Sequence, residues 1–326
     1  PLARVVFVLF LLLSTPVGIH HQYLDPGIAE GFKFIAMTNT MFLLLPSLLT
    51  AFTVVASVEH GARQRGGEGY LRWLGALPWR DPAFTGMALA GAMFAAGGFS
   101  GMINAGMNIN YLIHNTLWVP GHFHLPVGTA VALTMMAGSY WLVPQVTGTK
   151  LYSRPIGLLQ VIMWFIGMVF MSNAMHRAGL AGIPRRTAEP QYQNFDFLTP
   201  IGSIFELRVQ IALGGTLLFL SVVLFLFNIL LTSLGEESDR PVDSHLPEPL
   251  SGPEGSPRVL DNLAMWTGIA AVLVVLAYTL PLAGIIQNGG GLFGGGLPVP
   301  ATVSAGFDLV ATTVTSAFNT LWGVVA

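Results

Sequence analysis

The segment "VPGHFHLPVG", residues 119–128, places two histidines, His122 and His124, in a stretch that is otherwise apolar. On a regular α-helix, residues i and i+2 point about 200° apart, so these two side chains cannot bind the same ion. An unpaired polar group in a bilayer interior costs several kcal/mol, so each imidazole needs a partner on its own side. Carbonyls of neighbouring helices would meet that need, and so would axial ligation of two haems, one on either face.

The composition indicates an integral membrane protein. Hydrophobic residues make up 53% of the 326 residues and charged residues only 9%, which is too few to cover a soluble domain of this size. The net charge of −2 does not favour a nucleic-acid partner. Because the chain has no cysteine, disulfides and thiolate ligands are excluded, and any metal must be held by histidine or carboxylate.

Runs of about 20 apolar residues predict an all-α, polytopic transmembrane helix bundle with seven spans and a weaker eighth. Arginine and lysine in the loops at 59–82 and 147–155 favour a cytoplasmic location for both loops. The loop at 177–202 is then external although it carries three arginines, which suggests an anionic partner nearby. The predicted spans are 2–18, 30–58, 83–105, 119–143, 156–176, 203–234 and 260–286, with 302–325 as the weaker candidate.

A second histidine pair lies in "GIHHQYLDPG", residues 18–27. His20 and His21 fall where the first span ends, between Gly18 and Pro26, so the backbone can leave helical geometry and both rings can converge on one ion. Coordination by imidazole without thiolate suits copper or zinc. The alternative is a pair of interfacial histidines exposed to water.

Hydroxyl side chains form one stripe along the second span. Thr40, Ser47, Thr50 and Ser57 are separated by 7, 3 and 7 residues, which keeps them on one side of a helix. Such a stripe could order water for proton transfer toward the histidines. Serine and threonine in membrane helices also pack against neighbouring helices or bond their own backbone, so this alternative stays open.

Together, "HHQYLDPG" and "HNTLWVPGHFHLPVGTAVALT" resemble subunit I of the haem–copper oxygen reductases, or cytochrome c oxidases, most closely the ba3-like B-type branch. The resemblance extends through residue 286. It implies that 1–286 is the C-terminal half of the subunit I bundle, followed at 287–326 by a Gly-rich linker and a weak hydrophobic segment. It also implies the following ligands: His20 and His21 for the active-site copper, His122 for the high-spin haem iron, and His124 for the low-spin haem iron.

The resemblance assigns further residues. It implies that Arg185, Arg186, His114 and Asn110 lie at the haem propionates, although family members commonly have an acid at the position of Asn110. Guanidinium groups pair well with carboxylates, and the alternatives are contacts with lipid headgroups or another subunit, and a plain interfacial histidine at 114. In "PSLLT", Ser47 and Thr50 resemble the B-type proton channel; Thr40 has no similar support.

The implied activity is four-electron reduction of O2 to water, coupled to proton uptake and translocation. The implied cofactors are two haems, a high-spin a-type and a low-spin b- or a-type, and one copper ion. The implied partners are a subunit II with a copper electron-entry site, cytochrome c or a similar donor, and the lipid bilayer, with the prokaryotic plasma membrane as the expected location. No histidine precedes His20, so the remaining ligands are expected upstream, in an N-terminal part of subunit I.

Two other functions are compatible with the histidines. A nitric oxide reductase of the same superfamily would use non-haem iron and nearby glutamates, and Glu30 is the glutamate closest in sequence to the first pair. A haem-free transporter with histidines as proton relays would predict inverted repeats, which we do not find in the sequence.

Overall fold

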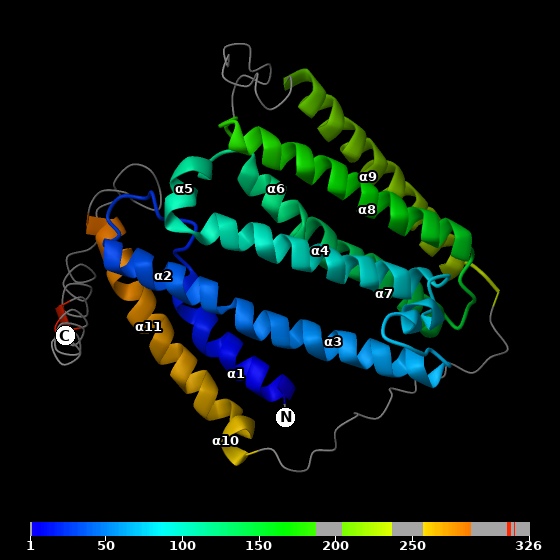
Figure 1. The fold of residues 1–326 in the computed structure, drawn as a ribbon, viewed down its shortest axis with the longest axis horizontal. Coiled ribbons are helices and arrows are strands. Elements are labelled where there is room, and N and C mark those ends of the chain that lie inside the picture. Colours follow the sequence, from blue (N-terminus) through cyan, green and yellow to red (C-terminus); the bar gives the residue numbers. More distant parts are fainter. Residues whose placement is uncertain (1, 187–203, 237–256, 288–311, 314–315, 317–326) are drawn as a thin grey trace. The chain divides into compact units, whose positions relative to one another are not determined.

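The computed structural model describes residues 2–186, 204–236, 257–287, 312, 313 and 316. Within these residues the chain is helical, and the β-structure there amounts to an isolated bridge between Thr116 and Pro184 (Figure 1). The chain divides into two compact units, residues 1–58, 105–111 and 250–326 in the first, and 59–104 and 112–249 in the second. Each unit is described by itself.

The first unit begins with an apolar helix that ends in a 3₁₀ turn, and a loop with both His20 and His21 follows it. The next long helix is interrupted at Leu43, because Pro46 has no N–H to donate to the carbonyl of Phe42. A small core of Ile19, Tyr23, Ile28 and Ala36 packs beneath the histidine loop. The helices that lie wholly or mostly in this unit are α1 (Leu2–Ser14), η1 (Thr15–Val17), α2 (Glu30–Phe42), α3 (Leu44–Gln64), α5 (Met107–Ile113), α10 (Arg258–Asp261) and α11 (Leu263–Gln287).

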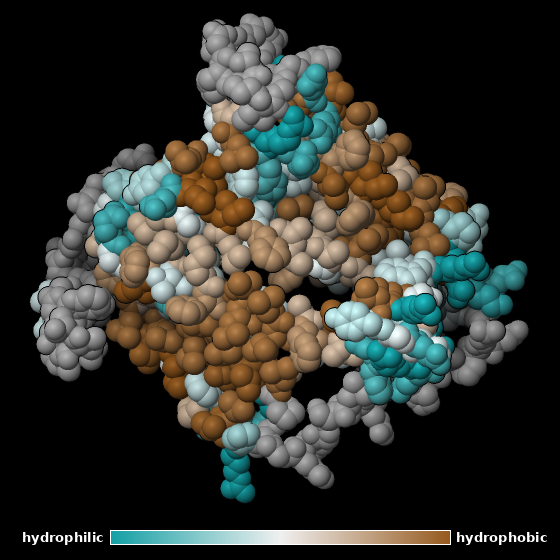
Figure 2. Space-filling model, viewed as in Figure 1, coloured by the Kyte–Doolittle hydropathy of each residue, from teal (hydrophilic) through white to brown (hydrophobic). Residues whose placement is uncertain are grey.

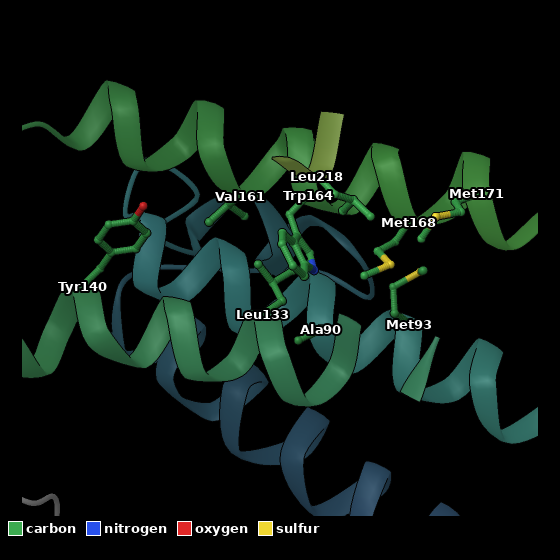
Figure 3. Packing of buried hydrophobic residues seen from close by; sticks show 9 residues of the cluster. All are labelled: Ala90, Met93, Leu133, Tyr140, Val161, Trp164, Met168, Met171 and Leu218. Atoms are coloured by element: carbon green, nitrogen blue, oxygen red, sulfur yellow. The ribbon is translucent and has the colours of Figure 1, made fainter. Parts of the chain in front are cut away.

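The second unit contains the helices that carry the other histidine pair. Its elements are η2 (Arg72–Ala76), α4 (Pro82–Ala105), α6 (Trp118–His124), the π-helical segment η3 (Pro126–Val131), α7 (Ala132–Thr147), α8 (Arg154–Leu180) and α9 (Ile204–Ser233). Helices α8 and α9 run side by side (Figure 1). Trp164 packs near Leu133 and Ala90 in the core of this unit, and the thioethers of Met93 and Met168 lie toward one end of it (Figure 3).

The helices confirm a multi-pass membrane protein. Five of the described helical segments are long and apolar enough to cross a bilayer: 30–64, 82–105, 118–147, 154–180 and 206–233. Two of the predicted spans correspond to shorter apolar helices at 2–14 and 263–279, and the weaker candidate at 302–325 lies almost entirely outside the described residues. Hydrophobic residues dominate the visible helix surfaces (Figure 2), as lipid contact requires.

The span predicted at 119–143 differs from a single regular helix. Helix α6 ends at His124, and the chain continues as η3 before α7 begins. Pro126 cannot donate a backbone hydrogen bond, and the wider turn is closed instead by the amide of Ala130, which donates to the carbonyl of Leu125 at 3.0 Å. The hydroxyl of Thr129 donates to the carbonyl of His124 at 3.0 Å, so this carbonyl stays paired inside the membrane.

Candidate metal-binding histidines

The imidazole of His122 lies against helix α4. Its Nδ1 is 2.9 Å from the hydroxyl oxygen of Ser100, and that hydroxyl is 3.0 Å from the carbonyl of Gly97. A Cβ placed at Gly101 would come within 2.8 Å of Cε1 of His122, so a glycine is needed for the ring to approach α4 this closely. Ser100 is buried. The side chain of His122 is therefore fixed by groups from a neighbouring helix.

The imidazole of His124 is held differently, by its own helix. Its Nδ1 lies 2.6 Å from the carbonyl oxygen of Pro120, one turn earlier in α6. A carbonyl can only accept, so Nδ1 is the protonated nitrogen and Nε2 keeps its lone pair. This is the tautomer that a metal-ligating histidine needs.

A close crossing of α6 and α8 fixes the helix that carries both histidines. A Cβ at Gly121 would lie 3.0 Å from the amide nitrogen of His176, and a Cβ at Gly179 would overlap the backbone of Trp118. The hydroxyl of Ser172 also donates to the carbonyl of Gly121 at 2.8 Å. Glycines at helix crossings let backbones approach closely, which gives van der Waals contact and positions α6 rigidly.

His20 and His21 lie in a turn directly after η1, as the sequence suggested for a pair at a helix end. The centroids of the two rings are 4.1 Å apart and their planes are nearly perpendicular. Tyr278 of α11 packs onto Gly18, just before the pair. Among the described residues, no group of three or more His, Cys, Asp or Glu side chains could hold a metal ion.

Thr40, which is partly buried, and Tyr23, which is buried, support the turn that carries His20. The hydroxyl of Thr40 donates to the carbonyl of Ala36 at 2.6 Å, and its oxygen lies 3.0 Å from Nδ1 of His20. The single hydroxyl proton is thus committed, so Thr40 accepts from Nδ1–H and Nε2 of His20 keeps its lone pair. Tyr23 is fully buried, and its hydroxyl donates to the carbonyl of Ala105 at 3.0 Å. Burial raises the pKa of Tyr23 above its usual value, so it remains a neutral donor.

The other hydroxyls of the stripe bond their own helix, which is the alternative that the sequence left open. Ser47 donates to Leu43 and Thr50 to Pro46, each at 2.8 Å. Ser57 donates to the carbonyl of Thr53, also at 2.8 Å. Each oxygen still has lone pairs that can accept from water, so these bonds do not decide between a proton path and a packing role.

The turn after helix α8 carries Arg185 and Arg186, two of the residues predicted to lie at the haem propionates. The amide of Arg185 donates to the carbonyl of Asn115 at 2.8 Å, and its guanidinium donates twice to Oδ1 of Asn115, at 3.0 and 3.2 Å. Arg185 is thereby brought next to the residue that follows His114. Arg186 is exposed and has a left-handed backbone. Asn110 is buried and belongs to the first unit, so its position relative to the other three is not described.

Sequence reasoning missed His176 and Trp118, which lie together at the α6–α8 crossing. Their ring centroids are 4.5 Å apart, with planes at 87°. Nδ1 of His176 lies 2.7 Å from the carbonyl of Ser172, whereas Nε2 of His176 and Nε1 of Trp118 are buried and have no hydrogen-bond partner among the described residues. The sequence carries no signal for this pair, because the two residues are 58 positions apart and become neighbours only where α6 and α8 cross.

A polytopic helical protein with oriented imidazoles on one helix fits the class of membrane metalloproteins or haem proteins. The model of the Cytochrome C and Quinol oxidase polypeptide I family matches residues 1–217, which is more than half of the chain. The chain therefore belongs to this family.

Relatives and a solved structure agree with this assignment. Cytochrome c oxidase subunit 1 of Thermus thermophilus is 43% identical over 286 residues, which is 85% of this chain and 50% of that protein. The Synechocystis subunit 1 is 27% identical over 198 residues, 59% of this chain and 32% of that protein. A haem–copper terminal oxidase dimer has a chain that is 28% identical with a TM-score of 0.78, and the match covers 98% of this chain and 57% of that chain. The chain thus spans about half the length of the Thermus relative. These matches favour neither a nitric oxide reductase nor a haem-free transporter.

Proposed function

We propose that this chain forms the C-terminal part of the catalytic subunit of a terminal respiratory oxidase, which reduces O2 to water and takes up and translocates protons. The observation that carries the proposal is the arrangement on α6. His122 and His124 each have Nδ1 committed to an acceptor, so each directs the Nε2 lone pair away from that acceptor, and the two acceptors lie on different elements.

The residues fit the metals that the family implies. His122 would hold the iron of a high-spin a-type haem, and His124 that of a low-spin b- or a-type haem. His20 and His21 would hold one copper ion, with a third ligand from the N-terminal part of subunit I. When bound, the two haems and the copper supply electron transfer and oxygen reduction. The chain supplies orientation, because Ser100, Pro120 and Thr40 fix the ring tautomers.

The surrounding residues control charge and protons. In the assembled membrane subunit, apolar helices would exclude water from the histidines, so negative charge gained there would be compensated by proton uptake. Ser47 and Thr50 would order the water that delivers protons from the cytoplasmic side, and Thr40 would complete the path beside His20. Arg185, Arg186, His114 and Asn110 would bind the haem propionates, a role that the exposed guanidinium of Arg185 and its contact with Asn115 support.

The proposed partners follow from the same function. The subunit would work with a subunit II that carries a copper electron-entry site, with cytochrome c or a similar electron donor, and with O2 as the substrate. The proposed location is the prokaryotic plasma membrane.

The test uses full-length subunit I purified with its partner subunits. We expect a Soret band, one copper ion for every two haems in addition to the copper that subunit II carries, and oxygen consumption with a reduced donor. His122→Leu should remove the high-spin haem signal, and His124→Leu the low-spin signal. His60→Ala is the matched control, because His60 is an exposed histidine of α3 that bonds Gln64, and it should keep both signals. A wild-type complex without haem absorption, or one with non-haem iron in place of copper, would overturn the proposal.

A further inference from the structure

The hydroxyl of Ser100 contacts Nδ1 of His122. It lies on α4, 22 residues before the histidine, and it is buried with 9% of its surface exposed. Gly101, the next residue, leaves room for the imidazole to pack directly on α4. The contact is therefore enclosed by helix packing and does not depend on an exposed, mobile side chain.

The direction of the hydrogen bonds in this contact follows from proton counting. A serine hydroxyl has one proton, and the carbonyl of Gly97, 3.0 Å away, can only accept it. The Ser100 oxygen must then accept from Nδ1–H of His122 across 2.9 Å. The imidazole, hydroxyl and carbonyl form a chain in which each bond polarises the next, and the acceptor at Nδ1 makes the ring more electron-rich at Nε2.

His124 provides a contrast within the same helix. Its Nδ1–H donates to the carbonyl of Pro120, which belongs to the backbone of α6. No side-chain substitution removes that acceptor. The two imidazoles are thus oriented by different means: His122 by a hydroxyl from another helix, and His124 by its own backbone.

We infer that Ser100 is a positioning residue for His122, which sets the tautomer, the rotation and the electron-donating strength of this ligand without affecting His124. The inference rests on the proposed function, because it concerns the iron that His122 would hold. Loss of the hydroxyl should weaken donation from Nε2. The bond from iron to this histidine would then be weaker, and the reduced form of that iron would be favoured.

The experiment uses full-length, haem-loaded oxidase with substitutions at Ser100. Ser100→Thr keeps the hydroxyl, and Ser100→Val has nearly the same shape as threonine without it. Ser139→Ala is the matched control, because this serine of α7 also donates to a helix carbonyl, that of Met135, but contacts no imidazole. Resonance Raman spectra of the ferrous enzyme report the iron–histidine stretch, and a spectroelectrochemical titration reports the midpoint potential of each haem.

We expect Ser100→Val to shift the iron–histidine stretch to lower frequency and to raise the midpoint potential of the high-spin haem. Ser100→Thr and Ser139→Ala should resemble the wild type, and the low-spin haem should be unchanged in all variants. If Ser100→Val loses the high-spin haem and retains the low-spin haem, the intact low-spin spectrum shows that α6 has folded, and the selective loss also supports the inference.

Two results would contradict the inference, and each has a different consequence. An unchanged stretch and potential in Ser100→Val, in an enzyme whose wild type shows a normal iron–histidine band, would overturn the role of Ser100 alone. A wild type that binds no haem would overturn the proposed function, and the inference with it.

Discussion

Two sets of buried polar groups in the second unit differ in how completely the protein pairs them. Between α7, α8 and α9, the hydroxyl of Tyr140 donates to Oε1 of Gln160, and Nε2 of Gln160 donates to Ser221, both at 2.9 Å. Ser221 in turn donates to the carbonyl of Gln160 at 2.8 Å. At the α6–α8 crossing, by contrast, Nε1 of Trp118 and Nε2 of His176 have no partner among the described residues.

The difference shows that a polar residue in a membrane helix can have either of two functions. The network around Gln160 is closed, because its donors meet acceptors on neighbouring helices, and it joins three helices in a medium that offers no water. Near α6, the Nδ1 nitrogens of His122 and His124 lie at hydrogen-bonding distance from acceptors, whereas Nε2 of His176 has no partner among the described residues. The closed network stabilises the assembled bundle, whereas the oriented imidazoles are the ones that we propose as a binding site.

The largest effect is expected from a substitution that separates α6 from α8. Gly179→Ala would place a methyl group on the backbone of Trp118, so α6 must move, at a cost of about 3 kcal/mol or more. The ratio of haem to protein in the purified full-length subunit should fall several-fold at both sites.

The control for this crossing is Gly91→Ala on α4, where a Cβ would meet no atom within 4 Å. This variant should keep its haem and gain slightly in stability, because alanine is the better helix former by about 1 kcal/mol. A Gly179→Ala enzyme with the haem content of the wild type would show that the crossing does not position the histidines.

A smaller effect is expected from the closed network. Gln160→Leu leaves the hydroxyl of Tyr140 without its acceptor and removes the donor to Ser221, which should cost about 1–3 kcal/mol. The temperature of thermal inactivation in detergent should fall, while the haem spectra stay as in the wild type. A change in the haem spectra at unchanged stability would mean that this network belongs to the binding site, and the distinction between the two regions would fail.

The smallest effect concerns Tyr23, whose paired hydroxyl lies two residues beyond the copper-site candidates. Tyr23→Phe removes the bond to Ala105 and should lower the free energy of unfolding by about 0.5–1.5 kcal/mol at neutral pH. The folded-state pKa of Tyr23 is raised by burial, so this stabilisation is fully present below the ordinary value of about 10 and is lost as pH rises toward the folded pKa.

Denaturant unfolding measures the difference in the free energy of unfolding between the wild type and Tyr23→Phe. This difference should decrease as the pH rises above about 10, the ordinary pKa of tyrosine. If this difference in the free energy of unfolding stays constant up to the most alkaline pH tested, burial does not raise the pKa of Tyr23.

Much of the fold could be predicted from the sequence because lipid imposes a simple rule. Long apolar runs must be helical for the backbone to be paired, so the spans and the all-α class follow from composition. The interruption after His124 was not predicted, since Pro126 is compatible with either a kink or a π-helical turn. The role of Ser100 was not predicted either, because its partner lies 22 residues away on another helix.

The sequence by itself determined the chemical inventory: a lipid-embedded, cysteine-free chain with two histidine pairs, one adjacent and one at a spacing of two. Tertiary structure decided which acceptor each imidazole meets, and hence which nitrogen keeps its lone pair. Hydrophobicity is a property of the residues themselves and can be read along the chain. The protonation of an imidazole depends on atoms from distant segments, which only the packing of helices brings within hydrogen-bonding distance.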